Sequence, residues 1–136
     1  MKLLSIVFSF KNEEKNIPEL INRTVKTISN FNNWNYEIIF VNDCSDDRSE
    51  EILLEFQKKY PITIINMSRT FGVAPCVLAG FRQAKGEAII YFDTDLQDPP
   101  ELMEKLIGEY EKGSEVVHTV RTKRLGESKI RLILTS

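Results

Sequence analysis

The segment IIYFDTDLQDPPELMEKL, residues 89–106, places acidic and amide side chains directly after an apolar run. Asp93, Asp95 and Gln97 are spaced by two residues, so in an extended chain all three side chains point to the same side. Carboxylate and amide oxygens suit Mg²⁺ and Mn²⁺, and such sites usually keep positions open for substrate phosphates. The spacing therefore predicts a divalent cation site.

Asp98 has a different predicted role from the acids that precede it. It stands before Pro99 and Pro100, and Glu101 follows three residues later. This spacing is typical of an N-cap residue, a proline at the first helical position and a capping acid. We therefore expect Asp98 to begin a helix behind the cation site.

The elements that must position these residues follow a repeating pattern. Most apolar runs of strand length are followed by a segment with helical spacing, and such runs without alternation are typical of a parallel sheet that is covered on both faces. The predicted fold class is therefore α/β, an open, doubly wound and mostly parallel sheet. The predicted strands are residues 3–10, 36–41, 62–67, 87–92 and 115–120.

Each predicted helix has an apolar stripe that should face the sheet. In the first helix, Asn16 and Glu19 predict a capped start. The predicted stripes are Ile17, Leu20, Ile21, Thr24, Val25 and Ile28; then Ile52, Leu53 and Phe56; then Ala74, Val77, Leu78 and Phe81; and finally Leu102, Leu106, Ile107 and Tyr110.

The polar strand ends are the expected place for a ligand, because open parallel sheets bind ligands beyond the carboxyl ends of their strands. The first four predicted strands end in SFKNEE, NDCSDD, SRTFG and DTDLQD. Three of these ends are acidic, which suits a phosphate-containing ligand only if a cation accompanies it. Neither familiar glycine-rich phosphate loop is present in the sequence. The strand ends therefore also indicate a metal.

Composition limits the classes of function. The chain has 136 residues, 42% of them apolar and 28% charged, which is ordinary for one globular domain. A net charge of −2 argues against a general nucleic-acid-binding surface, so no nucleic-acid partner is expected. The last 16 residues nevertheless hold five basic side chains and one acid.

The sequence also predicts a compartment. Cys44 and Cys76 form no CxxC pair and no disulfide-dense pattern, which favours a reducing, cytoplasmic setting. The amino terminus alternates like a strand and has no cleavage signature. No segment approaches the roughly 18 apolar residues that are typical of a membrane-spanning helix.

Several motifs together resemble one known family. NEEKNIPEL, EIIFVNDCSDD, SRTFG, LAGFRQAKGEAIIYFDTDLQDPPEL and GSEVVHTVRTKRLGES occur in the order and spacing of the polyisoprenyl-phosphate glycosyltransferases of glycosyltransferase family 2. That group includes dolichol-phosphate mannose synthases and bacterial undecaprenyl-phosphate sugar transferases. The resemblance covers nearly the whole chain. It implies a GT-A fold, a nucleoside diphosphate sugar donor, Mg²⁺ or Mn²⁺, an inverting transfer and a polyisoprenyl phosphate acceptor.

The resemblance also implies roles for residues around the donor. Asp93, Asp95 and Gln97 would hold the cation that bridges the donor diphosphate, with Asp95 counted among the catalytic residues and Asp93 also among the nucleotide-sugar contacts. Asp43 would contact the nucleoside, and Glu13 would face the nucleotide. The last donor-side candidate is Arg69, in the SRTFG loop.

On the acceptor side, Arg121 and Arg124 would lie near the phosphate as catalytic residues, with Ser128 and Arg131 as weaker candidates. We expect residues 1–120 to form the nucleotide-sugar-binding core. Residues 121–136 would begin a basic, partly apolar segment for the acceptor and an anionic membrane surface. The expected location is the cytoplasmic face of the membrane, in a longer parent protein of which this chain is an N-terminal fragment.

The sequence departs from the family pattern at a few positions. Ser9, Phe10 and Lys11 stand where the family usually has Pro-x-Tyr, Cys44 replaces a common glycine, and Thr70 replaces a common asparagine. These departures leave the nucleotide base open.

Three other interpretations stay open. A family 2 transferase could act on a sugar hydroxyl in polysaccharide synthesis, and the chain as given could be inactive toward its acceptor. Asp43 and Asp93 at strand ends also fit a non-enzymatic phospho-receiver module. Such a module would present a lysine at the end of its last strand, where this chain has Arg121.

Overall fold

The computed structural model describes residues 1–96, 98–121 and 130–135, and it describes side chains only as far as Val117. The chain divides into two compact units, residues 1–101 and residues 102–136, which are treated separately below. The predicted boundary near residue 120 stays a prediction.

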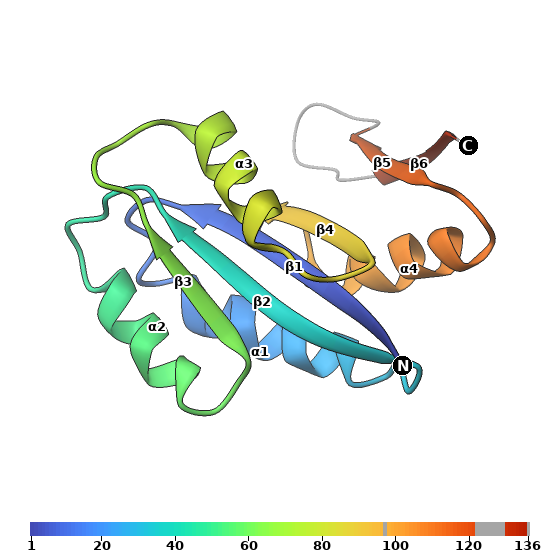
Figure 1. The fold of residues 1–136 in the computed structure, drawn as a ribbon, viewed down its shortest axis with the longest axis horizontal. Helices are drawn as coiled ribbons and strands as arrows, with labels where there is room; N and C mark the ends of the chain where they lie inside the picture. The colour runs from blue at the N-terminus through green and yellow to red at the C-terminus, as the bar shows by residue number, and fades with distance from the viewer. Residues whose placement is uncertain (97, 122–129, 136) are drawn as a thin grey trace. The chain divides into compact units, whose positions relative to one another are not determined.

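The first unit is built on a four-stranded sheet with the order β3-β2-β1-β4 (Figure 1). All three strand pairs are parallel, as predicted. The inner strand β1 is buried on both faces, since every one of its residues from Leu4 to Phe10 is buried. The strands are β1 (Lys2–Phe10), β2 (Trp34–Asn42), β3 (Ile62–Asn66) and β4 (Ala88–Asp93).

Helices cover both faces of this sheet, which confirms the doubly wound α/β class. Helices α1 (Ile17–Ile28) and α2 (Ser49–Gln57) lie on one face, and α3 (Val73–Gln83) lies on the other (Figure 1). On the face of α1, the rings of Phe8 and Phe40 stack with centroids 5.0 Å apart. On the opposite face, Cys76 of α3 packs into a buried cluster with Val7, Ile39 and Val41.

Helix α1 begins where the sequence predicts, but its capping differs. Asn16 precedes the helix in a helical conformation, φ −92° and ψ −26°, and makes no side-chain cap. A capping side chain needs an extended backbone to reach the first free N–H groups. The Asn16 amide instead donates to the Glu13 carboxylate at 2.8 Å, and Glu19 pairs with Arg23. The predicted capping role of Asn16 and Glu19 is therefore wrong.

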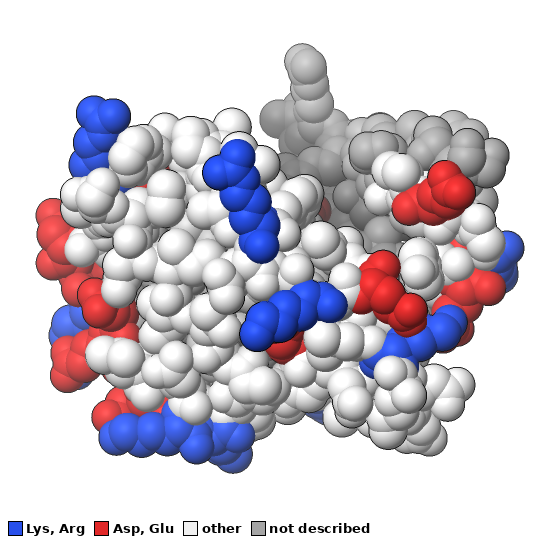
Figure 2. Space-filling view, in the orientation of Figure 1, with Lys and Arg blue, Asp and Glu red and all other residues white. Residues whose placement is uncertain are grey.

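The predicted apolar stripe of α3 is also wrong. Leu78 and Phe81 are 51% and 42% exposed, whereas the buried residues of the helix are Cys76 and Gly80. A Cβ atom at Gly80 would overlap the Val7 side chain, so small residues let this helix approach the sheet closely. The larger apolar residues point outward, and Figure 2 shows few charges over this helix.

The second unit contains α4 (Met103–Glu111), preceded by a short 3₁₀ turn, η1 (Pro100–Leu102), and followed by strands β5 (Val116–Arg121) and β6 (Ile130–Thr135). The strand predicted at 115–120 is confirmed, but it pairs antiparallel with β6 in a separate sheet. Within the described part of the chain, no helix has the length and apolar character that a membrane crossing requires.

The two helical glycines Gly80 and Gly108 should respond oppositely to alanine. Gly80→Ala should lower the free energy of unfolding by about 1–3 kcal/mol, since its new methyl group overlaps Val7. Gly108→Ala should raise it by about 0.5–1 kcal/mol, because no atom lies within 4 Å of the added Cβ and alanine favours the helix. Urea unfolding of both variants tests these two predictions. If both substitutions changed the free energy of unfolding in the same direction, the close packing of α3 on the sheet would be contradicted.

Candidate functional site

A cavity of about 310 Å³ lies where the first unit brings the carboxyl ends of β1, β2 and β4 together. Four of the predicted site residues line it: Glu13, Asp43, Asp93 and Asp95. Lys11 is the one basic residue among the lining residues. The structure therefore joins acids that lie up to 82 positions apart in the sequence into one strongly acidic site.

Asp43, directly after β2, holds the loop that follows β3. Its carboxylate accepts the backbone N–H of Phe71 at 2.8 Å and that of Gly72 at 3.0 Å. Burial raises the pKa of Asp43, but these two N–H groups, the Cys76 thiol and the charge of Lys11 together hold it below its ordinary value. Asp43 is therefore an ionised anchor of the SRTFG loop, and its contact with a nucleoside stays a prediction.

Cys76 lies beside this anchor, at the base of the cavity. Burial raises the pKa of its thiol to about 11, and the hydrogen bond to Asp43 and the Asp43 charge act in the same direction. The thiol is therefore protonated at neutral pH and is no candidate for a nucleophile.

The loops after β1 and β2 hold each other through backbone-to-side-chain hydrogen bonds. The Asn12 N–H donates to Ser45 Oγ at 2.9 Å, and Asn12 Oδ1 accepts the Asp46 N–H at 2.9 Å. The Glu13 N–H donates to Ser49 Oγ at 3.0 Å. These bonds fix the backbone that carries Glu13. The sequence did not predict them. Their only local signal is the abundance of Asn, Asp and Ser, which favour such bonds.

Asp93 and Asp95 lie at the end of β4 and both line the cavity. The spacing predicted an extended chain here, but the chain turns at Thr94 and Asp95. The Thr94 side chain is buried and its hydroxyl donates to the Ser9 carbonyl at 3.4 Å. The Tyr91 phenol donates to Asp93 Oδ1 at 2.8 Å. The turn and these bonds, rather than an extended run, bring both carboxylates to the cavity.

The donor set suits a hard divalent cation that arrives with a phosphate ligand. Among the residues that the structure describes, no three His, Cys, Asp or Glu side chains are grouped to hold a metal, and Gln97 lies outside those residues. Mg²⁺ is commonly held by one or two carboxylates, with substrate phosphates completing its shell. Asp93 and Asp95 supply that number of carboxylates at one cavity.

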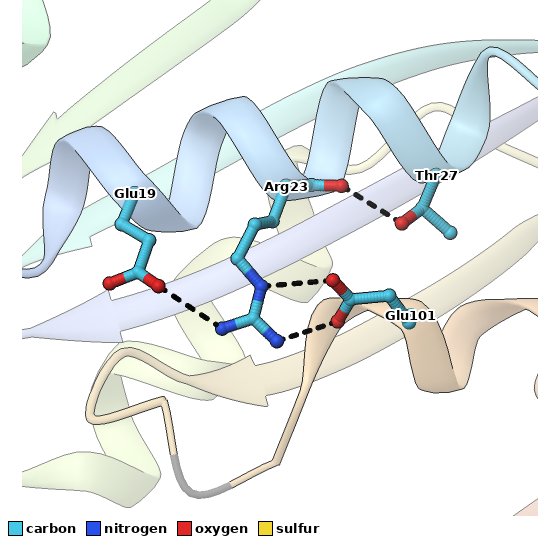
Figure 3. Close-up of polar contacts among 4 residues, drawn as sticks. All are labelled: Glu19, Arg23, Thr27 and Glu101. Carbon is cyan, nitrogen blue, oxygen red and sulfur yellow. Dashed lines mark hydrogen bonds and ion pairs between the residues drawn. The ribbon is translucent and has the colours of Figure 1, made fainter.

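An ion pair fixes the far end of the DTDLQDPPE segment. Arg23 of α1 donates from Nε to Glu101 Oε1 at 2.9 Å and from Nη2 to Oε2 at 2.7 Å, as Figure 3 shows. Such a two-point, charge-assisted contact is among the stronger protein hydrogen bonds. The bond to Arg23 lowers the pKa of Glu101. The segment is therefore held at Glu101 by the helix that follows β1.

This ion pair corrects the prediction for the start of the next helix. Glu101 was expected to cap a helix that begins at Asp98, but its carboxylate binds Arg23 instead. The 3₁₀ turn begins at Pro100, and Leu102 precedes α4 without a side-chain cap. The pair that holds this region spans 78 positions, so local spacing could not reveal it.

The other predicted residues are not brought to the cavity by the described structure. Arg69 packs over the Phe71 ring at 4.6 Å and is not among the lining residues. Arg121 and Arg131 lie in β5 and β6, where side chains are not described. Arg124 and Ser128 lie outside the described residues. The acceptor site therefore stays a prediction.

The family is settled by comparison with known proteins. The profile of glycosyl transferase family 2 matches residues 5–133, which is nearly the whole chain. The chain belongs to glycosyl transferase family 2. This membership confirms the resemblance seen in the sequence and makes the chain a glycosyltransferase domain.

Curated relatives extend the same finding. A Bacillus subtilis protein, the uncharacterized glycosyltransferase YkcC, is 47% identical over 91% of this chain and 38% of its own length. An undecaprenyl-phosphate 4-deoxy-4-formamido-L-arabinose transferase of Pseudomonas savastanoi is 38% identical over 91% of this chain and 37% of its own length. A Pseudomonas fluorescens protein of the same name is 40% identical over 89% of this chain and 36% of its own length. The family 2 chain thus spans less than two fifths of these relatives.

Solved structures share the fold. TarS residues 1–349 from S. aureus superpose with a TM-score of 0.72 at 21% identity, over 96% of this chain and 38% of that one. PcManGT, a mannosyltransferase from Pyrobaculum calidifontis solved in complex with GDP-Man and Mn²⁺, superposes with a TM-score of 0.68 at 19% identity. The match covers 89% of this chain and 35% of that one. Together with the sheet order, these likenesses confirm the predicted GT-A fold.

The structure describes the surroundings of three of the departures from the family pattern, Lys11, Cys44 and Thr70. Cys44, where a glycine is common, has φ 60°, a left-handed conformation that costs glycine least. Lys11 and Thr70, both unusual at their positions, contact each other, since Lys11 Nζ donates to Thr70 Oγ1 at 3.0 Å. The two substitutions therefore form one local unit at the edge of the cavity.

Asp43→Asn should lower the free energy of unfolding by about 1–3 kcal/mol at neutral pH, because an amide nitrogen would face a backbone N–H. Folding lowers the pKa of Asp43, so the stability that its ionised form contributes is present above the ordinary value of 3.8 and is lost as pH falls through the folded pKa. The difference in the free energy of unfolding between wild type and Asp43→Asn, measured with urea, should therefore be smaller in acid than at neutral pH.

The matched control is Asp46→Asn, an exposed aspartate in the same loop. It should change the free energy of unfolding by no more than about 0.5 kcal/mol at either pH. A difference for Asp43→Asn that is absent at neutral pH, or that widens in acid, would contradict the anchoring role.

Proposed function

We propose that this family 2 domain binds a nucleoside diphosphate sugar together with Mg²⁺ or Mn²⁺ and transfers the sugar, with inversion, to a polyisoprenyl phosphate. The observation that carries the proposal is the cavity at the strand ends, lined by Glu13, Asp43, Asp93 and Asp95. Four acids and a single lysine repel a bare diphosphate but accept one that brings a cation.

The chain's own residues would divide the donor between them. Asp93 and Asp95 would hold the cation of the diphosphate, while Asp43 lies next to the SRTFG loop and Glu13 lines the same cavity. When bound, the cation would act as a Lewis acid that stabilises the departing diphosphate without a proton transfer. The loop bonds of Asn12 and Asp43 keep these groups in place before the donor arrives.

A phosphate acceptor would need no general base, and the residues that line the cavity include no histidine. A phosphate monoester has its second pKa near 6, so its oxygen is largely ionised at neutral pH and can attack the sugar directly. Arg121 and Arg124 are the proposed acceptor contacts, because a guanidinium binds phosphate oxygens in pairs. The names of the Pseudomonas relatives support an undecaprenyl phosphate acceptor.

The proposed place of action is the cytoplasmic face of a membrane. A lipid acceptor would lie in a membrane, and residues 121–136 combine five basic side chains with the apolar residues Ile130, Leu132, Ile133 and Leu134. Basic residues near a bilayer are attracted to anionic lipids by about 1 kcal/mol each. An anionic membrane surface is therefore the proposed partner of this segment.

Donor binding should depend on the metal and on Asp95. Titrations with UDP, GDP and dTDP sugars should show binding that Mn²⁺ strengthens, and Asp95→Ala should remove most of that strengthening because one carboxylate ligand is lost. Glu55→Ala, at an exposed acid of α2, is the control and should bind like wild type. If no nucleotide binds, or if binding ignores both Mn²⁺ and Asp95→Ala, the proposed function is wrong.

Acceptor choice is tested separately, on the longest form of the protein that carries these residues. Transfer of radiolabelled sugar to a short polyprenyl phosphate should exceed transfer to the matching polyprenol at least tenfold, because the alcohol is not ionised. Replacing Arg124 by alanine should raise the KM for the phosphate acceptor. A preference for the alcohol would instead support the alternative with a hydroxyl acceptor.

A further inference from the structure

Tyr91 and Ser9 form a chain of hydrogen bonds that ends on Asp93. The Tyr91 phenol donates to Asp93 Oδ1 at 2.8 Å, and its oxygen lies 2.7 Å from Ser9 Oγ. Both distances are typical of well-formed O–H···O hydrogen bonds. The three side chains come from two neighbouring strands, β1 and β4, and they meet at the cavity that both Ser9 and Asp93 line.

The direction of the protons follows from counting donors. A phenol has one proton, and Tyr91 gives it to the Asp93 carboxylate, which can only accept. The bond between Ser9 and Tyr91 must then use the serine proton, so Ser9 donates to Tyr91 and Tyr91 donates to Asp93. Each hydroxyl polarises the next, which strengthens the bond at the carboxylate.

The backbone around this chain is rigidly placed. Ser9 pairs directly with Asp93 across the parallel strands, and Val7 pairs with Tyr91. The Tyr91 ring packs against the buried cluster that contains Val7 and Cys76, and Ser9 is only 8% exposed. Asp93 itself is exposed, at the point where β4 ends. A buried serine and a half-buried tyrosine therefore hold an exposed carboxylate that lines the cavity.

We propose that Ser9 and Tyr91 are positioning residues that orient the Asp93 carboxylate toward the divalent cation of the donor complex. An ionised carboxylate has about four acceptor sites, so the phenol occupies one and leaves capacity for a cation. Side chains that hold a metal ligand in this way commonly affect metal affinity about 10- to 100-fold. The inference rests on the proposed function, because it presupposes a donor that binds with a metal.

The test measures Mn²⁺ affinity directly. Free Mn²⁺ is followed by its electron paramagnetic resonance signal, in the presence of whichever of UDP, GDP and dTDP the wild-type chain binds most tightly. Tyr91→Phe should weaken Mn²⁺ binding about 10-fold or more, while binding of the nucleotide without metal stays unchanged. Tyr36→Phe is the matched control. It removes a phenol from β2 at the position that pairs with Leu4, far along the strands from Ser9, and it should leave Mn²⁺ binding unchanged.

A double-variant cycle separates positioning from simple stabilisation. Ser9→Ala should weaken Mn²⁺ binding less than Tyr91→Phe does. It should add nothing in the Tyr91→Phe background, because Ser9 acts only through the phenol. Thermal unfolding midpoints of all variants show whether the fold is intact.

The outcomes distinguish this inference from the proposed function. If the wild-type chain binds nucleotide with Mn²⁺ and Tyr91→Phe binds Mn²⁺ equally well, the positioning role is refuted while the proposed function stands. Independent, additive effects of Ser9→Ala and Tyr91→Phe would also refute it. If the wild-type chain shows no metal-dependent nucleotide binding, both the proposed function and this inference are refuted.

Discussion

The constraint on which the first unit depends is the burial of the inner strand β1 from Leu4 to Phe10. Every residue of β1 from Leu4 to Phe10 is buried, with β2 and β4 as parallel neighbours and helices on both faces. Polar side chains on such a strand would need partners in the interior, so they concentrate where the strands end. Because parallel strands end at the same edge, the acids of three strand ends meet in one cavity.

Among the four acids of the cavity, Asp43 is held ionised and oriented by hydrogen-bond donors, two of which the backbone supplies. Asp43 accepts two N–H groups of the loop after β3, and Asn12 joins the loops after β1 and β2. The bonds to Asp43 therefore stabilise this acid and order the SRTFG loop, whereas those of Asn12 order the loops after β1 and β2. Asp93 differs, because a phenol rather than a backbone group holds it, and it remains exposed to a ligand.

The sequence predicts what periodicity and strand-end position control, and it fails where a contact joins distant residues. The parallel sheet, the buried stripe of α1 and a ligand site at the strand ends were predicted from pattern. The family resemblance added Glu13 and Asp43 to Asp93 and Asp95 at that site. The stripe of α3 was not predicted correctly, because close packing of Gly80 on β1 outweighs hydrophobicity there. The partner of Glu101 is Arg23, and no local pattern links positions so far apart.

Charge balance ties the fold to the chemistry of the site. The cavity holds four carboxylates, and its one lysine donates a hydrogen bond to Thr70. The charge of Lys11 helps to keep Asp43 ionised, so it is already partly balanced within the protein. Asp93 and Asp95 line the cavity on the turn at the end of β4, which Thr94 ties to Ser9 and which leads to the Glu101–Arg23 ion pair. The four acids of this cavity would repel a bare diphosphate, so the proposed donor is expected to bind together with its metal.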